Sequence, residues 1–287
     1  MPDAKRKQKP RISIIGAGRL GTALGVALLQ RRYYIESLVA RRVQKARHAA
    51  SFLDAKPQVL AAKQLLSLRP ADLFLITVPD DQIASVAAEL SRLKFEATAL
   101  HTSGALSSDV LAPLRERGWH TGSIHPLISV SDTGASLEGA FWSVEGDAAA
   151  LRIGKAIVRD LGGQSFSIRS EHKPLYHAAA VMVSGNVVAQ FDVALEMLMH
   201  CGLNRKTARS ILLPLIASTV RSLETKDPAQ ALTGTFSRGD VETVKRHLAA
   251  LKKSELVDAL DLYRLLGQRS LKITKEHPQI TEILKSV

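Results

Sequence analysis

The stretch that most constrains the fold of this 287-residue chain is I-S-I-I-G-A-G-R-L-G, residues 12–21. Four strand-like residues enter a G-x-G-x-x-G turn formed by Gly16, Gly18 and Gly21, and apolar residues at helical spacing follow directly. A strand, a glycine turn and a helix in this order are typical of a dinucleotide site. Gly16 permits the tight turn, Gly18 leaves room for a pyrophosphate, and Gly21 lets the helix pack closely against the strand.

The helix that follows this turn contributes its N-terminus to the predicted site. Free N–H groups and a partial positive charge at a helix N-terminus attract phosphate groups. We therefore also assign Arg19 and Leu20, the residues directly after Gly18, to the cofactor site. The alternative is a glycine-rich turn in a sheet that binds nothing. The regular spacing of strand and helix favours the dinucleotide.

The end of the second predicted strand, residues 33–39, indicates which dinucleotide is bound. NAD-binding domains hold the ribose 2′-hydroxyl with an acidic residue at this place. Here the chain reads Ala40, Arg41 and Arg42, with no carboxylate. Because arginine can hold a 2′-phosphate by charge-assisted hydrogen bonds, we predict NADP(H) as the cofactor. The alternative is that both arginines are simply the solvated start of a helix.

Strand and helix patterns alternate through the first half of the chain. The run at 71–78 is almost continuously apolar, as expected for a strand that is covered on both faces. Alternation of this kind predicts an α/β sheet. Beyond the first two strands, we predict strands at 71–78, 97–102, 119–124, 141–144 and 164–168.

The pattern changes near residue 170, where strand signals end and helical periodicity continues to the C-terminus. We therefore predict an α/β Rossmann-like dinucleotide-binding domain at residues 11–168. An all-α domain for substrate binding and dimerisation is predicted at 169–287. Residues 1–10 are rich in lysine and arginine and are predicted to be a basic disordered tail.

Composition limits the other functions of the chain. The net charge is +12, yet no recognised nucleic-acid module accompanies it, so only nonspecific nucleic-acid binding stays as an alternative. No apolar run reaches about 18 residues and no apolar segment follows the basic N-terminus, so neither a membrane span nor a signal peptide is expected. The single cysteine, Cys201, fits a reducing cytoplasm, and we expect its thiol to be buried in a helix.

Several residues lie at the ends of predicted strands, at the edge of the sheet where ligands bind. Val78 and Pro79 end the strand at 71–78 and are expected to shape the nicotinamide ribose site. Ser103 and His125 follow two further strands, and their hydroxyl and imidazole groups can orient a carbonyl or donate a proton. Taken singly, each could equally be a turn-stabilising serine or a structural histidine.

A long helix is predicted at 173–201, at the start of the second half. Lys173, His177 and Ser184 fall on one face of it, at helical spacing. A cation, an imidazole and a hydroxyl on one face fit a catalytic surface. A core helix with a few satisfied polar groups explains them as well.

A glycine-framed loop at 232–240 carries Arg238, whose guanidinium suits a carboxylate or a phosphate. The alternative is an ordinary surface arginine at a turn. Asp240, at the end of this loop, is expected to cap the helix that follows.

Four segments together resemble one family: H-T-S-G-A at 101–105, G-S-I-H-P-L at 122–127, Y-H-A-A-A at 176–180 and L-T-G-T-F-S-R-G-D at 232–240. The chain resembles the oxidoreductases that join a Rossmann-like N-terminal domain to the domain of unknown function 2520. That architecture is similar to pyrroline-5-carboxylate reductases, ketopantoate reductases and 6-phosphogluconate-type dehydrogenases. Two departures are visible: Thr235 replaces the proline of the family's T-G-P loop, and Gly185 separates Ser184 from Asn186.

The resemblance implies an NADPH-dependent oxidoreductase, which would reduce a small polar C=O group, as in a 2-keto acid such as ketopantoate, or a C=N group in an interdomain cleft. Apolar stripes on the last helices predict a homodimer formed through them, and we expect no metal, membrane or specific nucleic acid. A non-catalytic NADP-sensing protein is the alternative, and a deazaflavin cofactor stays possible. The predicted proton donor is Lys173 or His177, the orienting groups are Ser103, His125 and Ser184, and the substrate contacts are Arg238 and Asn186.

Overall fold

A computed structural model of the protein describes residues 9–274 and 277–286. The predicted basic tail therefore lies outside the described residues, except for Lys9 and Pro10. Contacts divide the chain into two compact units, Met1–Val181 and Met182–Val287, and each is described by itself below. The predicted domain boundary between residues 168 and 169 stays a prediction.

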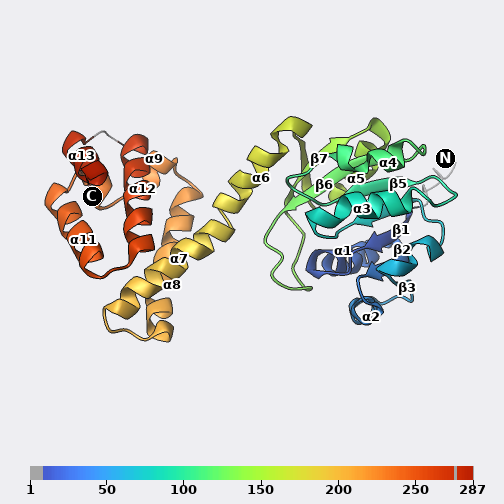
Figure 1. The fold of residues 1–287 in the computed structure, drawn as a ribbon, viewed down its shortest axis with the longest axis horizontal. Helices are drawn as coiled ribbons and strands as arrows, with labels where there is room; N and C mark the ends of the chain where they lie inside the picture. Colours follow the sequence, from blue (N-terminus) through green and yellow to red (C-terminus); the bar gives the residue numbers. More distant parts are fainter. Residues whose placement is uncertain (1–8, 275–276, 287) are drawn as a thin grey trace, which may run out of the picture. The chain divides into compact units, whose positions relative to one another are not determined.

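The first unit is built on one eight-stranded sheet in the order β3-β2-β1-β4-β5-β6-β7-β8. All neighbouring strands run parallel except β6 and β7, which are antiparallel because a loop, 128–140, joins them instead of a crossover helix. Figure 1 shows these strands in blue to green. The strands are β1 (Arg11–Ile15), β2 (Tyr34–Ala40), β3 (Gln58–Ala61), β4 (Leu73–Ile76), β5 (Thr98–His101), β6 (His120–Leu127), β7 (Phe141–Gly146) and β8 (Gln164–Ser167).

Helices cover both faces of this sheet and form two apolar clusters. One cluster joins Leu24 and Leu28 to Ile157 of a second helix, and the other centres on Phe74 and Ile83. A mainly parallel sheet needs this cover on both faces, and the predicted Rossmann-like α/β fold is confirmed. The helices are α1 (Arg19–Gln30), α2 (Val43–Ala50), α3 (Asp80–Leu90), α4 (Ala112–Arg115) and α5 (Ala148–Asp160), with short 3-10 helices η1 (Ala62–Ser67), η2 (Ser108–Leu111) and η3 (Ser170–His172).

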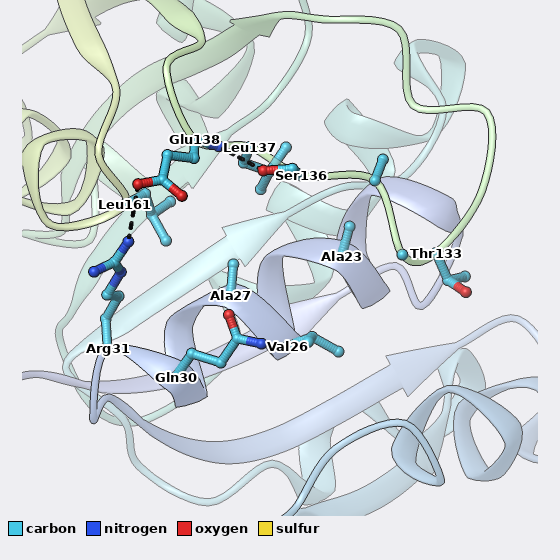
Figure 2. Close-up of a pocket in the computed structure, with 12 residues that line it drawn as sticks. Ala23, Val26, Ala27, Gln30, Arg31, Thr133, Ser136, Leu137, Glu138 and Leu161 are labelled. Carbon is cyan, nitrogen blue, oxygen red and sulfur yellow. Dashed lines mark hydrogen bonds and ion pairs between the residues drawn. The ribbon is translucent and has the colours of Figure 1, made fainter.

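The 128–140 loop runs beside α1, as Figure 2 shows. Arg31 pairs with Glu138 across the gap at 3.9 Å, and the guanidinium of Arg19 donates to the carbonyl of Ser131 at 3.2 Å. Between loop and helix is a cavity of about 230 Å³, which Ala23, Ala27 and Gln30 line from the helix side among others. This cavity does not include the glycine turn or the polar strand ends, so we treat it as separate from the candidate site.

The second unit is helical, as predicted, and Figure 1 shows it in yellow to red. Its cluster of packed, buried residues is small and consists of Val244, Leu248, Leu271, Ile280 and Leu284. Helix α6 (Lys173–Met182) carries the last residues of the first unit. The helices that follow are α7 (Gly185–His200), α8 (Arg205–Leu223), α9 (Pro228–Ala231), α10 (Thr235–Arg238), α11 (Val241–Lys253), α12 (Val257–Ile273) and α13 (Pro278–Ser286).

Three local expectations differ from the structure. The helix predicted over 173–201 is two helices, α6 and α7, separated at residues 183–184. Asp240 stands at the N-cap of α11 but makes no side-chain cap, because its carboxylate accepts from the guanidinium of Arg238. The thiol of Cys201 is exposed, where we expected it to be buried, because it lies just past the end of α7.

Within 9–274 and 277–286, one helical stretch, Ser170–His200, is long and apolar enough to cross a membrane. Its most apolar window has a mean hydropathy of 1.5, and only 6% of that window is buried. Length and composition alone support a membrane span only weakly, because an apolar helix of a soluble protein meets the same criteria.

Candidate functional site

The glycine turn between β1 and α1 has the geometry that its sequence predicts. Gly16 has a φ of +122°, a conformation that only glycine adopts readily, and its N–H donates to the carbonyl of Val39 at 2.9 Å. The hydroxyl of Thr77 donates to the carbonyl of Gly16 at 2.6 Å, so the end of β4 holds the turn. A Cβ at Gly21 would lie 2.0 Å from that carbonyl oxygen. Glycine is therefore required at both positions by packing alone.

Gly18 differs from its two neighbours, because a Cβ there would meet nothing within 4 Å. Packing within the protein therefore does not require glycine at position 18. Gly18 is also the N-cap of α1, whose first helical hydrogen bond runs from Thr22 to the carbonyl of Gly18. The N–H groups of Arg19 and Leu20 precede that bond and are available to an anion. An open glycine beside a helix N-terminus fits the pyrophosphate of a dinucleotide.

The other predicted cofactor residues lie at the ends of neighbouring strands. Arg41 and Arg42 directly follow β2, and both side chains are exposed. Val78 and Pro79 follow β4, where Val78 is half-buried and Pro79 is the N-cap of α3. Since β1, β2 and β4 are adjacent and parallel, these residues and the glycine turn share one edge of the sheet. The residues present fit a dinucleotide.

A cavity of about 270 Å³ lies at the same edge, within the first unit. It brings together three residues that we singled out from the sequence: Ser103, His125 and His177. Leu20, from the start of α1, also lines it, so the cavity is next to the glycine turn. Its other lining residues are Asp80, Thr102, Gly104, Pro126, Ile128 and Val130.

Two imidazoles form one wall of this cavity. The rings of His125 and His177 meet edge to face, with centroids 5.3 Å apart. Burial, reinforced by His177 and the ammonium of Lys173, lowers the pKa of His125 to about 4, so this imidazole is neutral at pH 7. The Nδ1 atom of His177 is buried and has no hydrogen-bond partner among the described residues. A buried nitrogen of this kind is ready to bind a ligand atom.

Gly104 lies directly beneath these two rings. A Cβ at this position would come within 2.4 Å of Nδ1 of His177 and 2.8 Å of Nε2 of His125. Both nitrogen atoms therefore lie against the same backbone position, and any side chain there would push them apart. The glycine of the H-T-S-G-A motif thus has a steric role in the site.

Lys173 does not line the cavity, although the sequence made it a candidate proton donor. Its side chain is fully buried, and the ammonium donates to the carbonyl of Ser103 at 3.0 Å and to the hydroxyl of Ser123 at 2.7 Å. The carboxylate of Glu145 lies 3.8 Å away and in turn accepts from Ser108. Burial lowers the pKa of Lys173, while Glu145 opposes that change. Lys173 therefore connects α6 to Ser123 of β6 and to the turn at Ser103.

Ser103 is also occupied by contacts within the protein. Its hydroxyl donates to the carboxylate of Asp80 at 2.7 Å and accepts from the N–H groups of Ala105 and Leu106. His101 is fully buried, and burial lowers its pKa to about 3. It accepts from the N–H of Ser103 and lies 3.2 Å from the carbonyl of Ser107. Both residues therefore shape the 101–107 turn that forms the floor of the cavity.

Sequence reasoning missed the roles of Asp80, Tyr176 and Gly104. Asp80 begins α3, and it also lines the cavity. The hydroxyl of Tyr176 lies 2.8 Å from Nδ1 of His125. Tyr176 directly precedes His177 on α6, so the Y-H pair was the available signal.

The remaining predicted site residues belong to the second unit. Ser184 is the N-cap of α7, and the amide of Asn186 lies 3.4 Å from the sulfur of Met182. Arg238 ends α10 and donates to the carboxylate of Asp240 at 2.7 Å. In the part of the chain that the structure describes, no cluster of three or more His, Cys, Asp or Glu could hold a metal ion.

Two family models match the chain. Residues 2–126 match a Rossmann-like domain, and residues 140–270 match the domain of unknown function DUF2520. The fold and the dinucleotide turn first define a Rossmann-type protein. The match to a DUF2520 domain follows the Rossmann-like match along the chain, in the order that the motifs predicted. No curated protein matches the chain.

Solved structures with the same fold include several reductases. A candidate NADP oxidoreductase from Bacteroides fragilis is 25% identical, with a TM-score of 0.77 over 92% of this chain and 98% of that one. A reductive aminase from Aspergillus terreus in complex with NADPH is 14% identical, with a TM-score of 0.67 over 92% and 94%. A 1-pyrroline-5-carboxylate reductase from Streptococcus pyogenes is 19% identical, with a TM-score of 0.62 over 88% and 97%. Together with the glycine turn, these similarities support an NAD(P)-dependent oxidoreductase.

Proposed function

We propose that this protein is an NADPH-dependent reductase of a small polar C=O or C=N compound. The observation that carries the proposal is the position of the 270 Å³ cavity, with its two imidazoles, directly beside the glycine turn. In α/β sheets of this kind, ligands bind outside the carboxyl ends of the strands. Bound NADPH would supply a hydride to the substrate.

The protein's own residues would hold the cofactor in the following way. The turn at Gly16, Gly18 and Gly21 seats the pyrophosphate against the start of α1. Arg41 and Arg42, which are exposed at the end of β2, bind the 2′-phosphate. The guanidinium of Arg19, which now donates to Ser131, is close enough to the turn to add a phosphate contact.

A test of this assignment compares NADPH with NADH by thermal unfolding. A ligand at about 100 times its dissociation constant stabilises the folded state by about 2.7 kcal/mol. We expect a clear shift with NADPH and a smaller one with NADH. Replacing both Arg41 and Arg42 by alanine should weaken NADPH binding by roughly tenfold to a hundredfold, about 1.4–2.8 kcal/mol, and leave NADH unchanged. Equal losses for both cofactors would contradict the 2′-phosphate assignment.

For the proton we favour His177 over Lys173. The ammonium of Lys173 is buried and bonded to Ser103 and Ser123, whereas His177 lines the cavity. His125 would donate a second hydrogen bond to the substrate and help to orient it. Ser103 acts mainly by fixing the floor of the cavity. Turnover that survives His177→Ala would contradict this assignment.

Asp80 favours a C=N substrate over a 2-keto acid. It is the only acidic or basic residue, imidazoles aside, among those described as lining the cavity. A carboxylate stabilises the positive charge that a neutral imine nitrogen gains when His177 gives it a proton, and it repels the carboxylate of a keto acid. A 2-keto acid such as ketopantoate would need a cation, and Arg238 stays the predicted source of it, with Asn186 as the other predicted substrate contact.

The decisive experiment follows NADPH oxidation with a panel of 2-keto acids, including ketopantoate, and of cyclic imines. Turnover of a cyclic imine is the expected result. NADPH binding without turnover of any compound would favour the alternative, a protein that senses NADP without catalysis. We also propose that the protein is a cytoplasmic homodimer formed through its C-terminal helices, a point tested below.

A further inference from the structure

The side chain of Tyr176 contacts His125 and is not among the residues that line the cavity. Its hydroxyl is 2.8 Å from Nδ1 of His125, and the two rings meet edge to face with centroids 5.6 Å apart. The ring of Phe166, from β8, also meets the tyrosine ring edge to face, with centroids 5.9 Å apart. The phenol therefore has little freedom to leave His125.

This contact decides which nitrogen of His125 carries the proton. A neutral imidazole has one donor nitrogen and one acceptor nitrogen, and the hydrogen bond at one nitrogen fixes the state of the other. The pKa of His125 is lowered to about 4, while burial raises the pKa of Tyr176. Both groups are thus neutral near pH 7. The charged or titratable groups that interact with this imidazole are Tyr176, Lys173, His177 and His101.

The surroundings of the phenol favour donation to His125. The hydroxyl of Ser143 is near enough to oppose the rise in the pKa of Tyr176, but it makes no hydrogen bond of normal geometry. Nδ1 of His125 is therefore the better acceptor for the phenol proton. When Nδ1 accepts, the proton of the imidazole must reside on Nε2, the atom that lies beside Gly104 at the cavity.

We propose that Tyr176 is a positioning residue that fixes His125 in its Nε2–H tautomer, with that N–H directed at the substrate site. Tyr176 itself touches neither substrate nor cofactor. Its effect is that a neutral, oriented N–H donor is in place before substrate binds, at a point where charge would develop on the reacting oxygen or nitrogen. The role of this donor rests on the proposed reductase function, but the tautomer does not.

The tautomer can be measured directly, without any substrate. Long-range ¹H–¹⁵N correlation spectra of the full chain, with ¹⁵N-labelled histidine, distinguish the two neutral forms, and His125→Gln identifies the signals of His125. We expect the wild type to show only the Nε2–H form between pH 6 and 8. In Tyr176→Phe, the Nδ1–H form should appear in a comparable amount.

The second unit offers a matched control. The hydroxyl of Tyr263 also lies 2.8 Å from Nδ1 of a histidine, His247, with the rings edge to face at 5.7 Å. Tyr263→Phe should alter the signals of His247 and leave those of His125 unchanged. A change at His125 in this control would indicate a general effect of losing a phenol.

A kinetic measurement then connects the tautomer to catalysis. With whichever compound of the panel is turned over, Tyr176→Phe should lower kcat roughly tenfold to a hundredfold, with the NADPH dissociation constant within about twofold of wild type. In the NMR spectra, an Nδ1–H form of His125 in the wild type would overturn the inference, and this result does not depend on whether Tyr176→Phe folds. An unchanged tautomer in Tyr176→Phe would overturn it as well, while NADPH turnover would keep the reductase proposal standing. The tautomer change without any turnover would defeat only the reductase proposal.

Discussion

The two units of this protein bury their side chains in opposite ways. In the first unit, apolar clusters fill both faces of the sheet, and even charged groups such as Lys173 are buried with partners. In the second unit, the long helices α7 and α8 together bury only Leu195 and Ala208. Large apolar side chains of these helices are exposed to between 41% and 70%: Val188, Met199, Ile211, Leu213, Leu215, Val220 and Leu223.

The first unit therefore has a core on both faces of its sheet, whereas the second exposes many large apolar side chains on two helices. Large apolar surface of this kind, where it is contiguous, marks an interface. A second copy of the chain is the occupant that we propose. The site of the first unit should therefore depend on its own packing, and the second unit should depend on association.

The largest expected effect concerns the glycine turn of the first unit. Gly21→Ala places a Cβ 2.0 Å from the carbonyl of Gly16, so we expect a loss of about 3 kcal/mol in the free energy of unfolding. Gly18→Ala meets no atom within 4 Å and should leave stability unchanged, yet it should weaken NADPH binding by roughly tenfold to a hundredfold, because its methyl group faces the predicted pyrophosphate.

Thermal unfolding with and without NADPH measures both effects. Gly185→Ala, at the start of α7, is a matched control, since its added Cβ also meets nothing within 4 Å. It should leave NADPH binding unchanged. If Gly18→Ala binds NADPH as the wild type does, the turn does not hold the pyrophosphate.

The next effect tests the exposed surface of α8. Replacing Leu215 and Val220 by glutamate should raise the dissociation constant of the dimer at least about a hundredfold, because each substitution removes apolar burial and adds a charge. Light scattering after size-exclusion chromatography should show a change from two chains to one chain of 31.1 kDa. Leu66→Glu, at a side chain of the first unit that is 44% exposed, should leave the mass unchanged. A wild-type monomer would refute the dimer.

The third effect concerns the buried histidines of the first unit. The pKa values of His101 and His125 are lowered to about 3 and about 4, from 6.5 in the unfolded chain. Below pH 6.5 the unfolded state therefore binds protons that the folded state excludes, so stability is full above pH 6.5 and falls toward pH 4. Each histidine contributes a slope of up to about 1.4 kcal/mol per pH unit.

Urea unfolding between pH 4.5 and 7 measures this slope. His101→Asn should reduce it by about one histidine's share, whatever its effect on stability at pH 7. His48→Asn, at an exposed position of α2, should keep the wild-type slope. An unchanged slope in His101→Asn would show that His101 binds the same number of protons in the folded and unfolded states, which would contradict its lowered pKa.

The smallest expected effect is on substrate preference, and it tests which unit recognises the substrate. Asp80→Asn keeps an acceptor for Ser103 but removes the negative charge from the cavity. It should shift the preference for a cyclic imine over a 2-keto acid by roughly tenfold toward the keto acid. Arg238→Gln should change this ratio less than twofold, since its guanidinium already pairs with Asp240. A tenfold effect of Arg238→Gln, with none from Asp80→Asn, would assign recognition to the second unit.

The sequence alone determined the features that depend on local spacing. The glycine turn, the arginines after β2, the alternation of strands and helices and the change to helices near residue 170 follow from backbone conformation and periodicity, which act over a few residues. The same local spacing identified three site residues: Ser103 and His125 at strand ends, and His177 on a helix face. The short strand β3 was missed because its four residues carry little periodic signal.

Only the tertiary structure decided how these residues are used. Lys173 and His177 are one helical turn apart, yet the lysine is buried against Ser103 and Ser123 while the histidine faces the cavity. The contact of Tyr176 with His125 joins residues 51 positions apart, and Asp80 reaches the site through a different strand end. Such contacts depend on which strands are adjacent in the sheet, and local spacing carries no information about that.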